Sequence, residues 1–355
     1  MAATFAPQPS SSRHRSRAAG LKSCMTKANA HTLTDIFDRS ISYLRVSLTD
    51  QCNLRCVYCT PTPLSKLNHA ELLTYEELLR VIAICVDLGI RKVRLTGGEP
   101  LVRRNVGSFI EGLAKINGLE DIRLTTNGVY LDKYAELLRQ AGVNKLNISL
   151  DSLRRERFRE ITGVDCFDQV WKNIEMVCAK GFTPVKINMV AMRGVNDDEL
   201  VDFAGLSLQR PLQVRFIEFM PIGNSAVWGK EKYIPSAEIM ERVQVLGRLD
   251  PLAQHRMDGP ARVFKLPGGM GSIGFISPLS HKFCEQCNRL RLTSEGKLRS
   301  CLLSDQESDL KSLIRNGASD EQIAALVMET IARKPQGHKV TEGENCHGRM
   351  SRIGG

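Results

Sequence analysis

The sequence predicts an α/β fold organised as a partial, TIM-like (β/α)6 barrel, followed by a small C-terminal α+β region. From residue 42 onward, short runs rich in valine, isoleucine and leucine alternate with longer helical stretches. Apolar runs of this kind are typical of strands that are covered on both faces. Six strand–helix units in series indicate a parallel sheet with right-handed crossovers. A complete barrel would need two more units, and a doubly wound sheet is the alternative arrangement.

The individual elements follow from this alternation. The expected strands are Tyr43–Leu48, Lys92–Thr96, Asp121–Thr125, Lys145–Leu150, Val185–Val190 and Val214–Met220. The expected helices between them are Tyr75–Leu88, Val106–Ile116, Lys133–Gln140, Phe167–Ala179 and Asp197–Leu208. Parallel sheets of this class bind their ligands at the carboxyl ends of the strands, so we expect the functional site at that edge.

The alternation of apolar strand runs with helical stretches ends near residue 235. The short runs Arg262–Leu266, Ser272–Ile276 and Arg289–Thr293 are separated by glycine and proline, which indicates hairpins. Helices are expected at Asp305–Arg315 and Asp320–Arg333. The predicted organisation is therefore an extension over residues 1–34, a barrel over 38–234, a C-terminal region over 235–340 and a tail over 341–355 that ends in Gly-Gly.

The net charge of +10 is unevenly distributed. Residues 1–34 carry five basic residues and no acid, and the rest of the chain has a modest basic excess. That excess is more typical of a solvated surface than of nucleic-acid binding, and it suits an anionic small molecule. We interpret residues 1–34 as a disordered extension, with an organellar transit peptide as the alternative. The expected location is the cytoplasm, or the mitochondrial matrix if the extension is a transit peptide.

Two trios of cysteines are the strongest chemical signal. Cys52, Cys56 and Cys59 form C-x3-C-x2-C on a short loop directly after the first expected strand. Three thiolates can hold three irons of a [4Fe–4S] cluster and leave the fourth iron open, which indicates chemistry rather than structure.

No apolar run of the sequence approaches the roughly 18–20 residues of a membrane span.

The second trio is Cys284, Cys287 and Cys301. A second open iron–sulfur cluster is the favoured interpretation beside the first trio. Structural zinc is the alternative, and it would recruit His281 or Cys346 as a fourth ligand.

Polar residues near these cysteines suit a charged ligand. Gly97-Gly98-Glu99-Pro100 follows the second expected strand, where glycines permit close approach of a ligand and Glu99 can accept from an amine. Arg289 and Arg291 lie on one face of a strand and form a fork that suits phosphate. Gly269-x-Gly271-x-x-Gly274 precedes a strand without a following helix, so we interpret it as a hairpin turn and not as a dinucleotide site.

The motif around Cys52, Cys56 and Cys59, with Tyr58 before the last cysteine and Gly-Gly-Glu-Pro downstream, resembles the radical S-adenosylmethionine (SAM) superfamily. The second trio, the run Asn288-Arg289-Leu290-Arg291 and the terminal Gly354-Gly355 extend the resemblance to the GTP 3′,8-cyclase family. That family performs the first step of molybdenum cofactor (molybdopterin) biosynthesis. The resemblance runs from about Asp38 to Gly355.

The resemblance implies a radical SAM barrel with two [4Fe–4S] clusters. The first cluster, on Cys52, Cys56 and Cys59, would bind SAM at its open iron, and the second, on Cys284, Cys287 and Cys301, would face the guanine base. Residues at the family's SAM-contacting positions are Tyr58, Gly98, Ser149 and Met220. Residues at its GTP-contacting positions are Arg45, Arg94, Thr125, Lys186, Arg289, Leu290 and Arg291.

The resemblance also implies a reaction and its partners. Reductive cleavage of SAM would give a 5′-deoxyadenosyl radical that takes hydrogen from C3′ of GTP, and C3′ would then bond to C8 to give (8S)-3′,8-cyclo-7,8-dihydroguanosine 5′-triphosphate. Expected partners are a low-potential donor of the flavodoxin or ferredoxin type and a downstream pyranopterin-forming enzyme, with a homodimer as a candidate assembly and no nucleic acid or membrane. The alternatives are a peptide-modifying radical SAM maturase with an auxiliary cluster, or a non-catalytic iron–sulfur or zinc protein.

Overall fold

The structure is a computed structural model, and it describes residues 33–59, 66–222, 228–253, 259–340, 346 and 349–354. Residues 32–355 form one compact unit that is distinct from residues 1–31. The expected extension over residues 1–34 thus lies almost wholly outside the described residues. Within the described ranges, no helix combines the length and the apolar character that crossing a membrane requires.

Twelve strands of the described chain form one sheet in the order β12-β11-β10-β1-β2-β3-β4-β5-β6-β9-β8-β7. The bounds are β1 Tyr43–Ser47, β2 Lys92–Thr96, β3 Asp121–Thr126, β4 Lys145–Ser149, β5 Val185–Ala191, β6 Leu212–Glu218, β7 Asp250–Pro251, β8 Arg262–Lys265, β9 Ser272–Ile276, β10 Arg289–Leu292, β11 Lys297–Arg299 and β12 Ser308–Asp309. Strands β1 to β6 pair in parallel in sequence order, which confirms the predicted barrel class.

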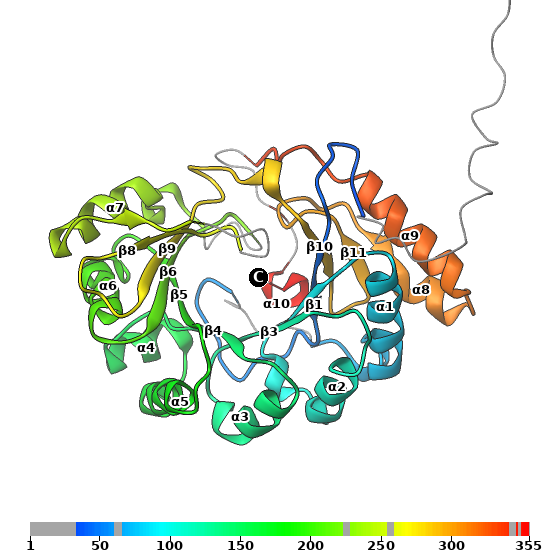
Figure 1. Cartoon of the computed structure of the whole chain (residues 1–355), viewed down its shortest axis with the longest axis horizontal. Coiled ribbons are helices and arrows are strands. Elements are labelled where there is room, and N and C mark those ends of the chain that lie inside the picture. The colour runs from blue at the N-terminus through cyan, green and yellow to red at the C-terminus, as the bar shows by residue number, and fades with distance from the viewer. Residues whose placement is uncertain are drawn as a thin grey trace, which may run out of the picture. The chain divides into compact units, whose positions relative to one another are not determined.

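The helices lie on the outer side of the curved sheet, and α10 lies within the curve (Figure 1). Their bounds are α1 Tyr75–Asp87, α2 Val106–Leu113, α3 Leu131–Gln140, α4 Arg155–Thr162, α5 Phe167–Ala179, α6 Leu200–Gln209, α7 Ser236–Val243, α8 Leu310–Arg315, α9 Asp320–Ala332 and α10 Met350–Ile353. The start of α1 shows how local sequence fixes a helix, because Thr74 and Glu77 form a reciprocal capping box. One face of α1, including Cys85, is buried against the sheet, which confirms Cys85 as a core residue.

Several expected boundaries were wrong. Helix α4 was not predicted, because its sequence is mostly charged and only Phe158 and Ile161 supply an apolar face. Strand β6 begins and ends two residues before the expected run, so Met220 lies in the loop after the strand. The expected helix Asp305–Arg315 begins only at Leu310, because Ser308–Asp309 pairs with β11 instead.

The C-terminal region adds strands to both edges of the barrel. Strand β10 pairs in parallel with β1, and β9 pairs in parallel with β6. Open edges carry unpaired backbone groups that favour such additions. The antiparallel pairing of β8 with β9 confirms the hairpin interpretation of the glycine-rich run before β9. The described strands β9 and β10 do not pair with each other, so the barrel stays open between them.

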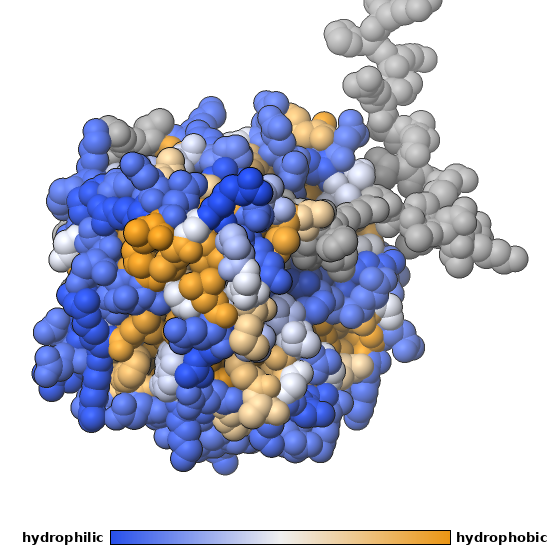
Figure 2. All heavy atoms as spheres, turned by 60° about the vertical axis from the view of Figure 1, so that its left-hand side comes forward, coloured by the Kyte–Doolittle hydropathy of each residue, from blue (hydrophilic) through white to orange (hydrophobic). Residues whose placement is uncertain are grey.

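The hydrophobic core lies between the sheet and the helices. Apolar positions of the central strands alternate with inward-facing polar ones, as in β5, where Val185, Ile187 and Met189 are buried in the core and the residues between them are less buried. Charged and polar side chains cover much of the face in Figure 2, with apolar side chains gathered in patches between them. The interior of the barrel is therefore separated from this core and is free to be polar.

The Gly97-Gly98 pair serves the packing of two loops. The N–H of Gly98 donates to the carbonyl of Thr49 (2.7 Å), and the N–H of Glu99 donates to that of Gln51 (2.8 Å). A Cβ added at Gly98 would overlap the carbonyl oxygen of Gln51, and one at Gly97 would overlap that of Thr49. The glycines are therefore required because the loop after β2 lies directly against the first cysteine loop.

We predict that Gly98→Ala will lower the free energy of unfolding by roughly 1–3 kcal/mol, because the new methyl group must displace backbone. Gly205→Ala is the matched control: Gly205 lies inside α6 with open space around its Cβ position, and alanine there should stabilise the protein by about 0.5–1 kcal/mol. Chemical denaturation under anaerobic conditions measures both. Equal stability of Gly98→Ala and the parent protein would contradict this account.

Candidate functional site

Positive charge is concentrated inside the barrel. Arg291, Arg45, Arg94 and Arg123 occupy successive positions of one register row across β10, β1, β2 and β3. Arg94, Arg123 and Arg291 are buried, as are Lys92 on β2 and Arg215 on β6. Like charges on neighbouring strands repel one another. The row therefore costs stability unless an anion lies among these side chains.

The pKa values of these groups report the same crowding. Burial and the neighbouring Arg94 hold the pKa of Arg215 well below its usual value. Burial and Arg123 lower the pKa of Lys92 to about 8. Burial would raise the pKa of Tyr43, but the surrounding cations, Arg94 first, outweigh burial and lower that pKa to about 8. The protonated forms of Arg215 and Lys92 are therefore disfavoured here, and the phenolate form of Tyr43 is favoured.

Partners inside the chain satisfy only part of this charge. Arg123 pairs with Asp121, with 2.8 Å between Nε and the carboxylate, and Arg215 donates to Asn188 Oδ1 at 2.9 Å. Arg94 reaches Thr125 Oγ1 only at 3.5 Å, and its buried Nε has no hydrogen-bond partner. A buried guanidinium N–H without a partner is costly. The observation fits a site that receives a polyanionic ligand.

An inner cavity of about 140 Å³ is lined by five of the arginines, namely Arg45, Arg94, Arg215, Arg289 and Arg291. An outer cavity of about 800 Å³ shares Tyr43, Gly259, Pro260, Phe283 and Arg289 with it. Together they fall within the roughly 300–1,000 Å³ that small-molecule sites occupy. Arg289 stacks over the Phe283 ring, with 4.7 Å between the guanidinium carbon and the ring centroid, at the boundary between the two cavities.

The first cysteine loop is held by hydrogen bonds to the end of α4 and to Asn127, which follows β3. Arg55 and Val57 donate their N–H groups to the carbonyls of Thr162 and Ile161 at the end of α4. Cys52 Sγ accepts from the N–H of Leu54 (3.4 Å) and from Asn127 Nδ2 (3.6 Å). Burial raises the pKa of Cys52 to about 12, and the nearby Glu99 and Cys59 add to this shift. A metal bound to these thiols would supply the positive charge that favours their thiolate forms.

Two buried carboxylates fix the loops around this trio. Glu99 accepts from the N–H of Asn127 (2.7 Å) and of Leu101 (3.0 Å), so its oxygens are already used by the protein. Burial raises the pKa of Glu99 to about 7 despite these donors. Asp151 accepts from the Tyr58 hydroxyl (2.7 Å) and from the N–H of Val190 (2.9 Å). The Tyr58 ring is thereby fixed directly beside the cysteine loop.

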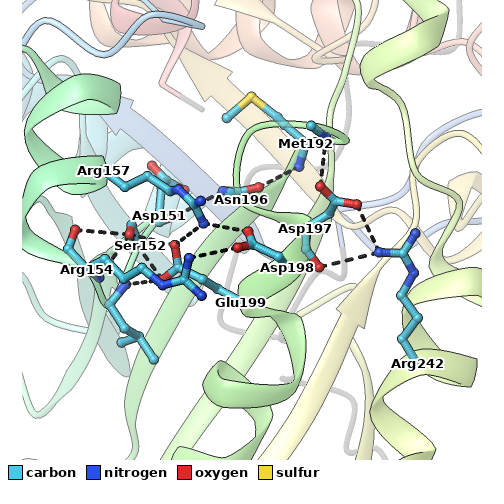
Figure 3. A network of polar contacts seen from close by, with 12 residues as sticks. Asp151, Ser152, Arg154, Arg157, Met192, Asn196, Asp197, Asp198, Glu199 and Arg242 are labelled. Carbon is cyan, nitrogen blue, oxygen red and sulfur yellow. Dashed lines mark hydrogen bonds and ion pairs between the residues drawn. The ribbon is translucent and has the colours of Figure 1, made fainter.

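A polar network supports Asp151 from behind (Figure 3). Asn196 donates to the Asp151 carbonyl at 2.9 Å. Glu199, fully buried, accepts from Ser152 Oγ at 2.8 Å and from Arg157 at 2.7 Å. The network connects the loop after β4 to the segment between β5 and α6, and it gives the carboxyl ends of these strands one rigid arrangement.

The second cysteine trio opens into the inner cavity. Cys284, Cys287 and Cys301 all line it, together with Arg291. Burial would raise the pKa of Cys287, but Arg289 and Lys334 outweigh it and lower that pKa to about 6. Within the described residues, no three His, Cys, Asp or Glu side chains surround a single point as one metal ion requires.

Two buried cations fasten distant segments around this trio. Arg39 pairs with Asp35 at 2.6 Å and donates to the carbonyls of Cys284 (2.9 Å) and Pro335 (2.8 Å). Lys334 Nζ donates to the carbonyls of Arg289 (2.8 Å) and Ser300. The segment just after α9 is therefore held against both ends of the second cysteine region.

The C-terminal tail also reaches the barrel interior. Arg291 donates to the Gly354 carbonyl, and a Cβ added at Gly354 would crowd Thr96. Gly354 adopts a φ of +70°, which favours glycine. The small Gly354 therefore lets the end of the described chain lie inside the barrel, while Gly355 lies outside the described residues.

The structure brings most of the expected site residues together. The inner cavity is lined by Arg45, Arg94, Thr125, Met220, Arg289, Arg291 and the second trio. Lys186 lies on β5 opposite Asn147, on the side that faces the interior. Gly98, Tyr58 and Ser149 lie at or just beyond the carboxyl ends of β2, β1 and β4. Leu290 does not join them: strand alternation turns its side chain into the hydrophobic core.

Sequence reasoning missed several interior residues. Lys92, Arg123 and Arg215 belong to strands that were predicted as apolar and buried. The signal that could have found them is a charged side chain at alternate positions within such a strand, as in Lys92 and Arg94 of β2.

We predict that Arg215→Met will raise the free energy of unfolding of the ligand-free protein by roughly 1–4 kcal/mol, because a buried, repelled cation is replaced by an apolar side chain of similar length. The same variant should bind tripolyphosphate more weakly in calorimetry. Arg248→Met is the control, since Arg248 is exposed and its ion pair with Asp250 contributes about 1 kcal/mol at most. Destabilisation by Arg215→Met together with unchanged anion binding would contradict this interpretation.

Comparisons with known proteins agree with this geometry. A family model described as the Radical SAM superfamily matches residues 46–206, and one described as Molybdenum Cofactor Synthesis C matches residues 212–340. The GTP 3′,8-cyclase of Thermodesulfovibrio yellowstonii is 49% identical over 326 residues, which cover 91% of this chain and 100% of that protein. The GTP 3′,8-cyclase of Pelotomaculum thermopropionicum is 46% identical over 325 residues, with the same coverage.

A solved structure shares the fold. Streptococcus suis SuiB, crystallised with S-adenosylmethionine, superposes with a TM-score of 0.59 and 13% identity over 80% of this chain and 67% of that one. At this level of identity the similarity shows the fold alone. The two family models and the full-length relatives carry the assignment: the chain belongs to the GTP 3′,8-cyclase family of the radical SAM superfamily.

Proposed function

We propose that this chain is a lyase that converts GTP to (8S)-3′,8-cyclo-7,8-dihydroguanosine 5′-triphosphate, the first step of molybdenum cofactor biosynthesis. Its substrate is GTP, and its cofactors include SAM and a [4Fe–4S] cluster. The observation that carries the proposal is a cation-lined cavity that has a cysteine trio in its wall, in a chain of this family. SAM and its cluster, when bound, supply the one-electron chemistry that removes hydrogen from the ribose.

The first cysteine loop is our proposed site for that cluster. Cys52, Cys56 and Cys59 are the proposed ligands, and their electrostatic coupling indicates that they lie close together. Tyr58, Gly98, Ser149 and Met220 are the proposed SAM-contacting residues. Tyr58 is supported by its bond to Asp151, which fixes the ring next to the cluster loop.

We assign a second [4Fe–4S] cluster to Cys284, Cys287 and Cys301. The support is chemical: all three thiols face one cavity, and two cations beside Cys287 favour its thiolate form. In the cluster-loaded protein this cluster would occupy the end of the cavity at which we place the purine.

The triphosphate is proposed to lie among the interior cations. Arg45, Arg94, Thr125, Lys186, Arg289 and Arg291 are the expected contacts, and we add Arg215, because it lines the same inner cavity. Charge-assisted hydrogen bonds contribute roughly 1.5–3 kcal/mol each. Several of them would hold the nucleotide in one pose, which is an entropic contribution to the reaction because the reacting carbon must face SAM. The position of the inner cavity inside the barrel would also limit the access of water during the reaction.

The remaining partners stay predictions. They are a flavodoxin- or ferredoxin-type donor, a downstream pyranopterin-forming enzyme and a homodimeric assembly. The cytoplasmic location, the matrix alternative and the domain boundary near residue 235 also stay predictions.

The test is anaerobic incubation with GTP, SAM and a chemical reductant, followed by mass analysis for 5′-deoxyadenosine and a cyclised nucleotide. We expect both products, and about eight irons per chain from two four-iron clusters. Cys287→Ser should reduce the iron to about four per chain and abolish cyclisation. Zinc in place of iron, or full iron content in Cys287→Ser, would contradict the assignment of the second trio.

Removing Gly354 and Gly355 should abolish GTP cyclisation and spare reductive cleavage of SAM, because Arg291 donates a hydrogen bond to the Gly354 carbonyl inside the barrel. The measurement is the yield of cyclised nucleotide relative to 5′-deoxyadenosine. Adding two residues after Gly355 is a useful companion, since it keeps both glycines. Retained cyclisation after the deletion would make the tail irrelevant to the reaction.

A further inference from the structure

His338 is a polar residue of the inner cavity that the proposed function leaves without a role. It lines the cavity together with the second cysteine trio and is only 8% exposed. Its Nε2 lies 2.8 Å from the carbonyl oxygen of Pro278, whereas its buried Nδ1 has no hydrogen-bond partner among the residues that the structure describes. A buried nitrogen without a partner, next to a cavity, indicates a missing ligand atom.

The contact with Pro278 decides the tautomer of His338. A carbonyl oxygen can only accept, so Nε2 must carry the hydrogen and donate. Burial lowers the pKa of His338, which favours the neutral ring. Nδ1 then bears a lone pair and no hydrogen, and it presents a hydrogen-bond acceptor.

The segment that carries His338 is held firmly against the second trio. Arg39 donates to the carbonyls of Cys284 and Gln336, and Lys334 donates to the carbonyl of Arg289. A Cβ added at Gly337 would lie 3.8 Å from Cys284 Sγ, so the backbone next to His338 passes close to this cysteine. The imidazole is therefore positioned by several bonds, and its place does not depend on the Pro278 contact alone.

The cationic side chains of the cavity wall are arginines, which only donate, and no carboxylate is among the described residues that line it. The neutral acceptors of the wall include Thr125, Asn147, Asn188 and Ser300, and Asn188 Oδ1 already accepts from Arg215. The arginines suit phosphate, whereas the Watson–Crick edge of guanine presents the N1–H and 2-amino donors and needs acceptors. Adenine presents an acceptor at N1 instead. A neutral imidazole nitrogen with a lone pair, facing the N1 and C2 positions of the purine, is complementary to the N1–H and 2-amino group of guanine and not to the N1 lone pair and C2–H of adenine.

We propose that Nδ1 of His338 accepts a hydrogen bond from the donor edge of the guanine base and thereby selects GTP over ATP. The inference rests on the proposed function, because it needs the purine to lie at the end of the cavity that carries the second trio. Sites that pair a polar substrate group discriminate strongly against analogues that leave the protein group unpaired.

Two substitutions separate the acceptor role of Nδ1 from the contact by which Nε2 holds the ring to Pro278. His338→Gln can still donate to Pro278 through its amide nitrogen, but it places no acceptor at the position of Nδ1. His338→Asn can place its amide oxygen near that position but cannot reach Pro278. His281→Gln is the control, because His281 is an exposed histidine of the outer cavity.

The measurement is calorimetric binding of GTP, ATP and tripolyphosphate to cluster-loaded protein, with iron content checked for each variant. We expect His338→Gln to weaken GTP binding about three- to tenfold and to leave ATP and tripolyphosphate unchanged. We expect His338→Asn and His281→Gln to keep the parent preference for GTP. Inosine triphosphate, which keeps N1–H and lacks the 2-amino group, then shows which donor is used, since only an N1–H contact leaves its binding sensitive to His338→Gln.

Other results would overturn the inference. Weak GTP binding in His338→Asn with normal binding in His338→Gln would make His338 only a tether. An equal loss for GTP, ATP and tripolyphosphate would indicate a collapsed cavity, and no change in either variant would remove His338 from the site. Failure of the parent protein itself to bind GTP would instead overturn the proposed function and this inference with it.

Discussion

The constraint on which this structure depends is the gathering of like charge inside the barrel. Four arginines occupy one register row, and Lys92 and Arg215 add to them from β2 and β6. Asp121 forms an ion pair with Arg123, at one end of the row. Such an interior is unfavourable for the empty protein and favourable for a polyanion, because a bound triphosphate removes repulsion and gains charge-assisted bonds together. Part of the folding stability is thereby exchanged for affinity.

A second principle of construction is the use of buried carboxylates as acceptors for loop backbone. Glu99, Asp151, Glu199 and Glu218 lie at or near the carboxyl ends of strands, and each accepts from a backbone N–H of a neighbouring loop. A carboxylate that accepts such bonds fixes the geometry of a loop directly, without a series of intervening side chains. These bonds hold the loops next to the first cysteine trio, and the bond from the Tyr58 hydroxyl to Asp151 holds the Tyr58 ring. A fixed geometry of this kind is what positioning of a reactive cofactor requires.

The second cysteine trio shows the opposite solution, in which segments far apart in the sequence close one site. Arg39 comes from the start of the described chain, Lys334 and His338 from the segment after α9, and Gly354 from the end of the chain. The strands β9 and β10 complete the parallel part of the sheet on its two edges. Strands that extend the barrel sheet thus also carry the surroundings of this trio, and the region from β7 onward cannot be treated as an appendage of the barrel.

The sequence by itself determined the barrel class, nearly all central strands and both cysteine trios. These depend on local patterns, namely apolar runs of strand length and cysteine spacing on short loops, which need no knowledge of distant contacts. Only the tertiary structure decided the cationic row, the role of Gly97-Gly98 in loop packing, the core position of Leu290 and the free nitrogen of His338. Each of these depends on register between strands or on a contact over many residues, and residues that are neighbours in space leave no common signal in a single sequence.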